Sequence, residues 1–163
     1  MPNQPYQFHF FLHCGHLIEE RLRTKLTPLE VMPRQARVLD ALGRMGQASQ
    51  VQLADEFGLS AASMSTMTAR LLTAGLIERR VDEHELRSNV LKLSKHGKGL
   101  LTQIYEVWRE LDQEIYEAIG SENATQLARI THELRNAFGG FTPGENSSNT
   151  EELASTQLIL KQS

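Results

Sequence analysis

One group of side chains that could bind another molecule lies on one face of a helix predicted between Ser60 and Leu72. Met64, Met67 and Leu71 recur at spacings of three and four, so they should face the interior. The opposite face has no acid and a single base, whereas a solvent-facing helix usually carries several of each. Small polar side chains let a helix approach the floor of the DNA major groove, where hydroxyls can meet base edges and phosphates. That face consists of Ala61, Ala62, Ser63, Ser65, Thr66, Ala69 and Arg70.

A second short helix and a hairpin should position this face. Ser49 with Gln52 forms a capping box that begins a helix, and Gly58 can end it. Ser60 can then cap the following helix, which carries the small polar face. Two short helices joined by a tight turn make a helix-turn-helix, whose second helix enters the groove. Residues 76–81 and 88–93 flank a charged turn and predict a β-hairpin wing. An ordinary helical hairpin with a surface turn is the alternative.

Over roughly residues 8–138 the sequence resembles the MarR family of bacterial transcriptional regulators. Within the predicted helices and first strand the matching residues are Leu53-Ala54, Gly58-Leu59-Ser60, Leu71 and Gly75-Leu76-Ile77-Glu78-Arg79. The family's wing pattern is Asp-x-Arg-Asp-x-Arg, followed by a strand and Leu-Thr-x-x-Gly. Here it reads Asp82-x-His84-Glu85-x-Arg87 and Leu93-Ser94-x-x-Gly97, and Thr66 stands where the family often has a recognition-helix Arg. The resemblance implies a mainly α fold with a small β-hairpin wing, in which terminal helices form a dimerisation region.

The expected DNA contacts combine the helix face with the wing. Arg87 matches the family's wing arginine and is the candidate for a narrow minor groove, where protonated His84 could join it. An ion pair of Arg87 with Asp82 or Glu85 that shapes the wing is an alternative role, compatible with the first. We expect Arg70 on a phosphate at the groove wall. Near base edges and phosphates we expect Ser60, Ala62, Ser63, Ser65 and Thr66.

The distribution of charge along the chain favours DNA binding, although the net charge of the whole chain is negative. The 163 residues carry a net charge of −3. Residues 60–100 hold seven bases and four acids, giving +3, whereas residues 101–163 hold four bases and ten acids, giving −6. Positive charge is therefore concentrated where DNA phosphates would lie.

Amphipathic helices are predicted on both sides of the winged region. One runs over residues 7–26, and another from Ser94 to about Ile119 keeps its apolar period for about 25 residues, roughly 38 Å. After Gly120, Ser121 should cap a further helix. A helix that long cannot bury its apolar stripe against the small winged region alone, so we expect a second chain to cover it.

These patterns predict the organisation of the whole chain. We expect one domain over residues 1–163, with dimerisation helices at 7–32 and 97–139. Between them a winged helix-turn-helix region spans 33–96, and a flexible tail follows at 140–163. The absence of a long apolar run predicts that no segment spans a membrane, and no secretory leader is expected. The single cysteine, Cys14, agrees with a reducing cytoplasm, so we expect a cytoplasmic protein.

Regulation is expected from a small molecule. The family resemblance implies an aromatic acid or phenol-like ligand that binds between the dimerising helices and the head and lowers DNA affinity. The first helix offers His9, His13 and His16 on roughly one face, beside Cys14. Such histidines can pair with a carboxylate ligand, hold a metal or sense protons, or can simply be solvated or packed at an interface. We expect an organic anion ahead of a metal, because no acidic cluster flanks them.

The sequence therefore predicts a homodimeric repressor that binds a pseudo-palindromic operator in double-stranded DNA and is released by an organic effector. No glycine-rich phosphate loop, paired-cysteine metal motif or nucleophile elbow is present, so we expect neither an enzyme nor a cofactor. Two alternatives stay open. One is a metal- or redox-responsive regulator of the same fold that uses the histidines or Cys14. The other is a dimeric interaction protein without specific DNA binding.

Overall fold

The computed structural model describes residues 6–81 and 89–143 of the chain. A 20-residue helix, α1 (Gln7–Leu26), leads through a 3₁₀ turn, η1 (Thr27–Leu29), to α2 (Pro33–Met45). Helices α3 (Gln50–Phe57) and α4 (Ala61–Thr73) precede strands β1 (Ile77–Val81) and β2 (Asn89–Leu93). Helices α5 (Lys95–Ile119) and α6 (Ser121–Ala137) complete the order. The predicted fold class, mainly helical with one antiparallel hairpin, is confirmed.

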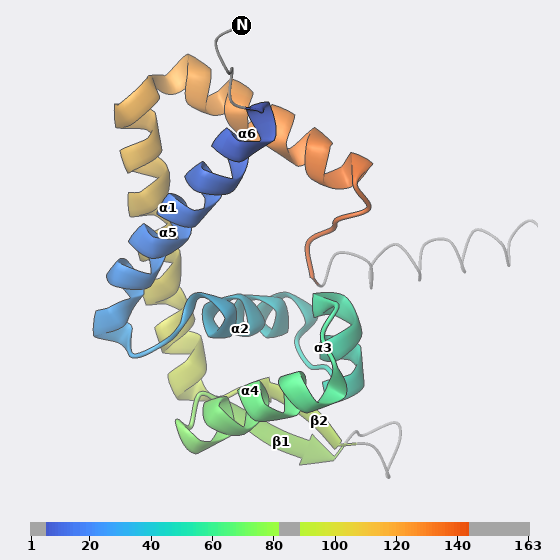
Figure 1. Ribbon diagram of the computed structural model, residues 1–163. Helices are drawn as coiled ribbons and strands as arrows, with labels where there is room; N and C mark the ends of the chain where they lie inside the picture. Colours follow the sequence, from blue (N-terminus) through green and yellow to red (C-terminus); the bar gives the residue numbers. More distant parts are fainter. Residues whose placement is uncertain (1–5, 82–88, 144–163) are drawn as a thin grey trace, which may run out of the picture.

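Helix α5 connects two parts of the molecule (Figure 1). Helices α2, α3 and α4 and the hairpin form a body at one end of α5, which we call the head. Helices α1 and α6 lie toward the other end and, with the C-terminal half of α5, form what we call the arm. The segments expected to dimerise at 7–32 and 97–139 thus correspond to α1 with η1 and to most of α5 with α6. Of the tail predicted at 140–163, only residues 140–143 are among the described residues.

Apolar side chains from the head, the end of α1 and the start of α5 share one core. In α2 the apolar residues Ala36, Val38, Leu39, Ala41 and Leu42 are all fully buried. Full burial of a leucine-sized side chain stabilises the fold by roughly 1.5–3 kcal/mol relative to exposure. Other members of the core are Leu26, Leu53, Met64, Leu71, Leu91 and Ile104.

Local signals account for most helix ends. Pro33 is the first residue of α2, a position that suits proline, and Ser49 caps α3 with the predicted capping box. The strands start at Ile77 and Asn89, each one residue later than expected. The cap predicted from Ser121 is wrong. Gly120 takes the capping position with φ 81° and ψ 152°, and Ser121 is the first residue of α6, because the two helices are joined by a single residue.

The junction between the hairpin and α5 brings two backbones into close contact. The Ser94 hydroxyl accepts a hydrogen bond from the Gly97 amide (2.9 Å) and donates one to the Gly75 carbonyl (2.6 Å). The Ser94 amide donates to the Leu76 carbonyl at 3.1 Å. A Cβ atom on Gly97 would lie 1.9 Å from the Leu76 carbonyl oxygen, so only glycine fits there. This contact fixes the first turn of α5 on the start of β1.

Two polar contacts fix α5 against α1 and α2. Lys25 of α1 lies 2.8 Å from Glu114 and 3.2 Å from Glu110, both on α5. The hydrogen bond from Lys25 lowers the pKa of the Glu114 carboxyl. Nearer the head, the Tyr105 hydroxyl donates to Asp40 of α2 at 2.8 Å, and burial with this bond raises the pKa of Tyr105.

Replacing Gly97 by Ala should lower the free energy of unfolding by about 1–3 kcal/mol, because the added methyl overlaps the Leu76 carbonyl. Gly99 is the matched control, since it lies two residues further along α5, is exposed and has no atom within 4 Å of an added Cβ. Gly99→Ala should leave stability unchanged or raise it by about 0.5–1 kcal/mol. Urea denaturation of both variants measures the difference, and equal stability would contradict the close contact.

Candidate nucleic-acid interface

Helix α4 presents the predicted chemical face to solvent. Met64 and Leu71 are fully buried and Met67 is half-buried, so the apolar side of the helix packs on the head as predicted. The residues predicted to meet DNA on this helix are all exposed, namely Ser60, Ala62, Ser63, Ser65, Thr66 and Arg70. The structure therefore brings them together on one accessible surface.

Hydrogen bonds within this surface orient several of its hydroxyls. Ser60 caps α4 by accepting from the Ser63 amide at 3.1 Å, and its hydroxyl donates to that of Ser63 at 2.9 Å. Thr66 donates its hydroxyl hydrogen to the carbonyl of Ala62 at 3.1 Å. Because that hydrogen is used, Thr66 offers the outside mainly its oxygen lone pairs, which can accept from a base amino group.

The turn before α4 has the geometry that its sequence predicts. Gly58 ends α3 in the left-handed region at φ 59°, where residues with a side chain are strained. Its amide donates to the Asp55 carbonyl, and the Leu59 amide donates to that of Ala54, at 3.1 and 2.9 Å. Leu59 is half-buried between the helices. Helices α3 and α4 with this turn and the hairpin make a winged helix-turn-helix.

A buried hydrogen bond that the sequence reasoning missed links the two helices. Thr68 of α4 is fully buried, and its hydroxyl accepts from the side-chain amide of Gln50 in α3 at 2.6 Å while donating to the Met64 carbonyl at 2.9 Å. Thr68 lies four residues after Met64, so helical spacing could have placed it on the inner face. Its polar side chain masked that signal. The pair positions α4 on the first residue of α3.

The two strands of the wing pair in antiparallel register from Ile77 with Leu93 to Val81 with Asn89. A further bridge joins Ala48, just before α3, to Leu91. Arg80 pairs with Glu78 at 3.0 Å. The wing tip, with His84 and Arg87, lies outside the described residues, so their contacts to DNA stay predictions.

Arg70 is the exposed cation of α4. It makes no ion pair with any residue in the ranges 6–81 and 89–143, whereas Arg44 and Arg80 in the head are each paired with a carboxylate. An arginine without an acidic neighbour keeps its full charge available for a phosphate. The contact of Arg70 with a phosphate stays a prediction.

The three histidines of α1 lie together on an exposed face of that helix. His16 is 3.4 Å from Glu20, and the His9 ring packs edge-on against Phe8. A cavity of about 400 Å³ between α1, α5 and α6 is lined on the α1 side by Phe11, Cys14, Gly15 and Ile18. At 3.6 residues per turn, His9, His13 and His16 occupy the opposite side of α1 from that cavity. Their role in binding an organic ligand stays a prediction.

Within residues 6–81 and 89–143, no cluster of three or more His, Cys, Asp or Glu side chains is placed to hold a metal ion. None of the described helices combines the length and the apolar character needed to cross a membrane.

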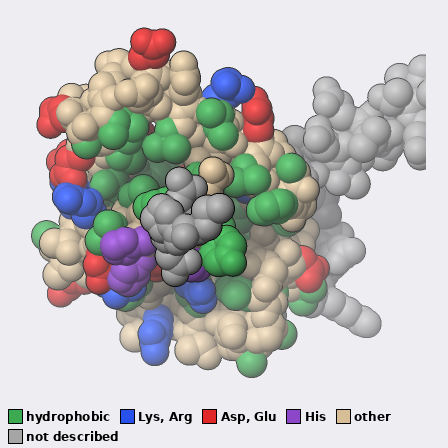
Figure 2. All heavy atoms as spheres, turned by 45° about the horizontal axis from the view of Figure 1, so that its top comes forward, with side chains coloured by type: hydrophobic (Ala, Val, Ile, Leu, Met, Phe, Trp, Pro, Cys, Tyr) green, Lys and Arg blue, Asp and Glu red, His purple; other side chains and the backbone are tan. Residues whose placement is uncertain are grey.

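The arm exposes a broad apolar surface. Figure 2 shows hydrophobic side chains across the face formed by α1 and α6. Phe8, Phe11 and Leu12 of α1 are more than half exposed, and Ile130 of α6 is 49% exposed. The apolar stripe of α5 is buried at Leu101 and Ile104 but open at Ile119, which is 40% exposed. Within residues 6–81 and 89–143, no other segment covers this surface.

Comparison with known proteins agrees with this geometry. The profile of the MarR family matches residues 28–88. A curated relative, the multiple antibiotic resistance protein MarR of Salmonella typhimurium, is 25% identical over 114 residues, which cover 69% of this chain and 79% of that protein. Wild-type MarR from E. coli in its apo form superposes with a TM-score of 0.70 at 19% identity, over 81% of this chain and 98% of that one.

A mutant of E. coli MarR crystallised with operator DNA gives a TM-score of 0.68, also at 19% identity, over 77% of this chain and 91% of that one. The resemblance that the sequence indicates is thereby confirmed. The chain carries the MarR-family sequence pattern over residues 28–88 and the fold of a MarR-family transcriptional regulator over most of its length.

Replacing Thr68 by Val keeps the shape of the side chain but removes the bond from Gln50 and should lower the free energy of unfolding by about 1 kcal/mol. Thr68→Ser retains the hydroxyl and should keep that bond, at the smaller cost of a missing methyl group. Chemical denaturation with the Gln50→Ala variant and the double variant measures the coupling. Additive losses would show that the two side chains do not stabilise each other.

Proposed function

We propose that the protein is a homodimeric, sequence-specific DNA-binding transcriptional regulator whose α4 helix enters the major groove of a pseudo-palindromic operator. The proposal rests on the exposed face of α4, whose side chains are small and polar. Helix α4 is the second helix of the helix-turn-helix, the one that enters the groove in this motif. Positive charge in residues 60–100 favours phosphate contact, and the operator-bound relative supports this mode of binding. His84 and Arg87 extend the proposed interface to an adjacent minor groove.

We assign the dimer contact to the arm. Exposed apolar side chains on α1 and α6 continue the open end of the α5 stripe, and a second copy of the chain can cover all three. A two-fold dimer would place two heads on one side of DNA at half-sites one helical turn apart. Sedimentation velocity checks the state, and a monomer at micromolar concentration would contradict this assignment.

We further propose repression that is relieved by a small organic ligand of the aromatic-acid or phenol type. A ligand that binds better to a head spacing unsuited to DNA shifts the population away from the DNA-bound form. Protonated His9, His13 and His16 could hold its anionic group, and they are exposed and adjacent.

Fluorescence anisotropy tests the central proposal. The protein is titrated onto its own upstream DNA and onto scrambled DNA of the same composition, at several salt concentrations. We expect much tighter binding to the upstream DNA with a steep salt dependence. If binding to both is weak and equal, a selection from genomic fragments separates a distant operator from a dimeric interaction protein. Aromatic acids, metals and oxidants added to a specific complex then distinguish organic release from metal- or redox-responsive release.

Arg70→Ala should weaken binding to all DNA sequences by a similar factor and reduce the slope of log K against log salt by about 1. The reason is the loss of one phosphate contact that carries no sequence information. Arg109→Ala is the control, since Arg109 is an exposed arginine of α5 paired with Glu106. A loss restricted to the operator would contradict the phosphate role.

Arg87→Ala should weaken operator binding by about 1–3 kcal/mol if the side chain reads a groove. The salt series above, repeated with operators that differ only in the base pairs flanking the half-sites, locates the loss. Unchanged affinity would remove Arg87 from the interface and favour its alternative role in shaping the wing.

A further inference from the structure

The chain turns back toward the head after α6 (Figure 1). The Gly139 amide donates to the Asn136 carbonyl and the Gly140 amide to the Arg135 carbonyl, both at 2.9 Å, and Gly139 has φ 76°. This pair of bonds closes the helix end and sets the direction in which the chain leaves it. Arg135 also donates to the Thr142 hydroxyl at 2.9 Å, so a side chain of α6 holds the returning segment.

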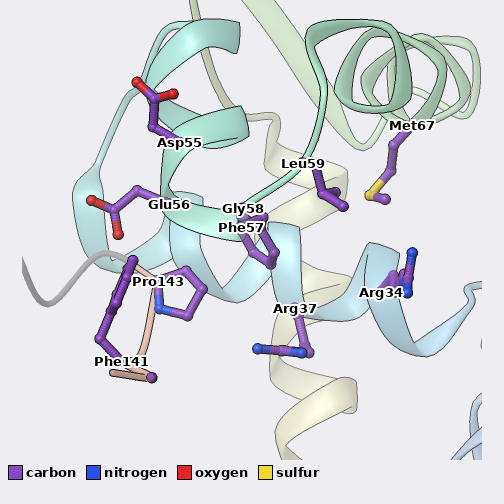
Figure 3. Close-up of a pocket in the computed structure, with 11 residues that line it drawn as sticks. Arg34, Arg37, Asp55, Glu56, Phe57, Gly58, Leu59, Met67, Phe141 and Pro143 are labelled. Carbon is purple, nitrogen blue, oxygen red and sulfur yellow. The ribbon is translucent and has the colours of Figure 1, made fainter. Parts of the chain in front are cut away.

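The returning segment meets the head at the base of the helix-turn-helix. Pro143 is buried, and Phe141 is 40% exposed. Together with Gly140 they form one wall of a cavity of about 320 Å³. The facing walls come from α2, from the α3–α4 turn and from Met67 of α4. Figure 3 shows Pro143 next to Glu56 and Phe57, with Phe141 directed toward the same space.

This contact lies at the turn that sets the start of α4. The last residue of α3 is Phe57, and the turn consists of Gly58 and Leu59, which precedes the α4 cap. The Arg37 guanidinium packs over the Phe57 ring at 5.8 Å, which connects the turn to α2. Burial of a proline at this place removes apolar surface from water and ties α6 to the turn.

We propose that residues 139–143 are an intramolecular strap, which docks at the end of α3 beside Glu56 and Phe57 and fixes the orientation of the head relative to α6. Helix α5 and the α1–α2 connection join the head to the arm on one side, and the strap joins them on the other (Figure 1). The head is thereby held at two places, and detachment of the strap frees it to pivot about α5. A consequence for DNA affinity rests on the proposed function, whereas the docking itself does not.

Distance measurement by pulsed electron resonance tests the strap without DNA. Spin labels are placed on Val51→Cys in α3 and Arg129→Cys in α6 of a Cys14→Ser chain, since both positions are exposed. Labelled chains are diluted with unlabelled ones, so that only distances within one chain are recorded. The strap variant is the full chain with Phe141→Ser and Pro143→Ser. The matched control carries Leu153→Ser and Leu158→Ser, two apolar residues beyond the strap.

We expect a single narrow distance distribution in the parent and the control, and a clearly broader one in the strap variant. Hydrogen exchange of the backbone amides in unlabelled protein gives a second measurement. The protection factors of residues 55–59 should fall about tenfold in the strap variant and stay unchanged in the control. Equal distributions and equal protection in strap variant and control would overturn the proposal. Because neither readout involves DNA, the proposal can stand if operator binding fails and can fall if operator binding succeeds.

Discussion

The close backbone contact between Gly97 and Leu76 is the constraint on which the rest of the structure depends. Helix α5 must begin against the start of the hairpin because Ser94 bonds Gly75, Leu76 and Gly97 at once. The direction of α5 therefore follows from the position of β1. Since α5 carries the arm, the relation between head and arm starts at this junction. A Cβ atom at residue 97 would overlap the Leu76 carbonyl, so the two backbones could not keep this contact.

The candidate DNA-binding surface likewise depends on a few specific contacts. Helix α4 is held from below by Met64 and Leu71, from α3 by the bond between Gln50 and Thr68, and at its start by the turn at Gly58. Because these contacts hold the inner side of α4, the side chains on its outer side are not needed for packing and can be small and polar. That division explains how a helix with few charges can be a stable part of the head while its outer face stays available for a groove.

The arm has the opposite character. Its apolar side chains are numerous and many of them are exposed, so the described part of its own chain does not complete its packing. A partner copy that covers α1 and α6 would fix the arms to each other, and the proposed strap would fix each head to its own arm through Pro143. The two contacts act in series, because the spacing of the heads is set only if both the arms and the head–arm angle are rigid. Under the proposed function, a ligand that loosened either contact would change whether two heads fit successive grooves.

The sequence by itself determined the local features of this protein. The capping box at Ser49, the turn at Gly58, the cap at Ser60 and the periods of α4 and α5 each depend on residues within a few positions of one another, and so their signals can be read along the chain. Recognition of the MarR pattern rests on the same short stretches. The exposed face of α4 followed from spacing alone.

Only the tertiary structure decided the features that join distant residues. The bond between Gln50 and Thr68, the contact of Gly97 with Leu76 and the return of Pro143 to the α3–α4 turn each join residues from separate elements. The histidines of α1 could be assigned to one face from sequence, yet their position opposite the cavity depends on how α5 and α6 pack on α1. Such contacts are selected by the packing of whole elements, in which a polar side chain such as Thr68 is buried because its neighbours supply a hydrogen bond.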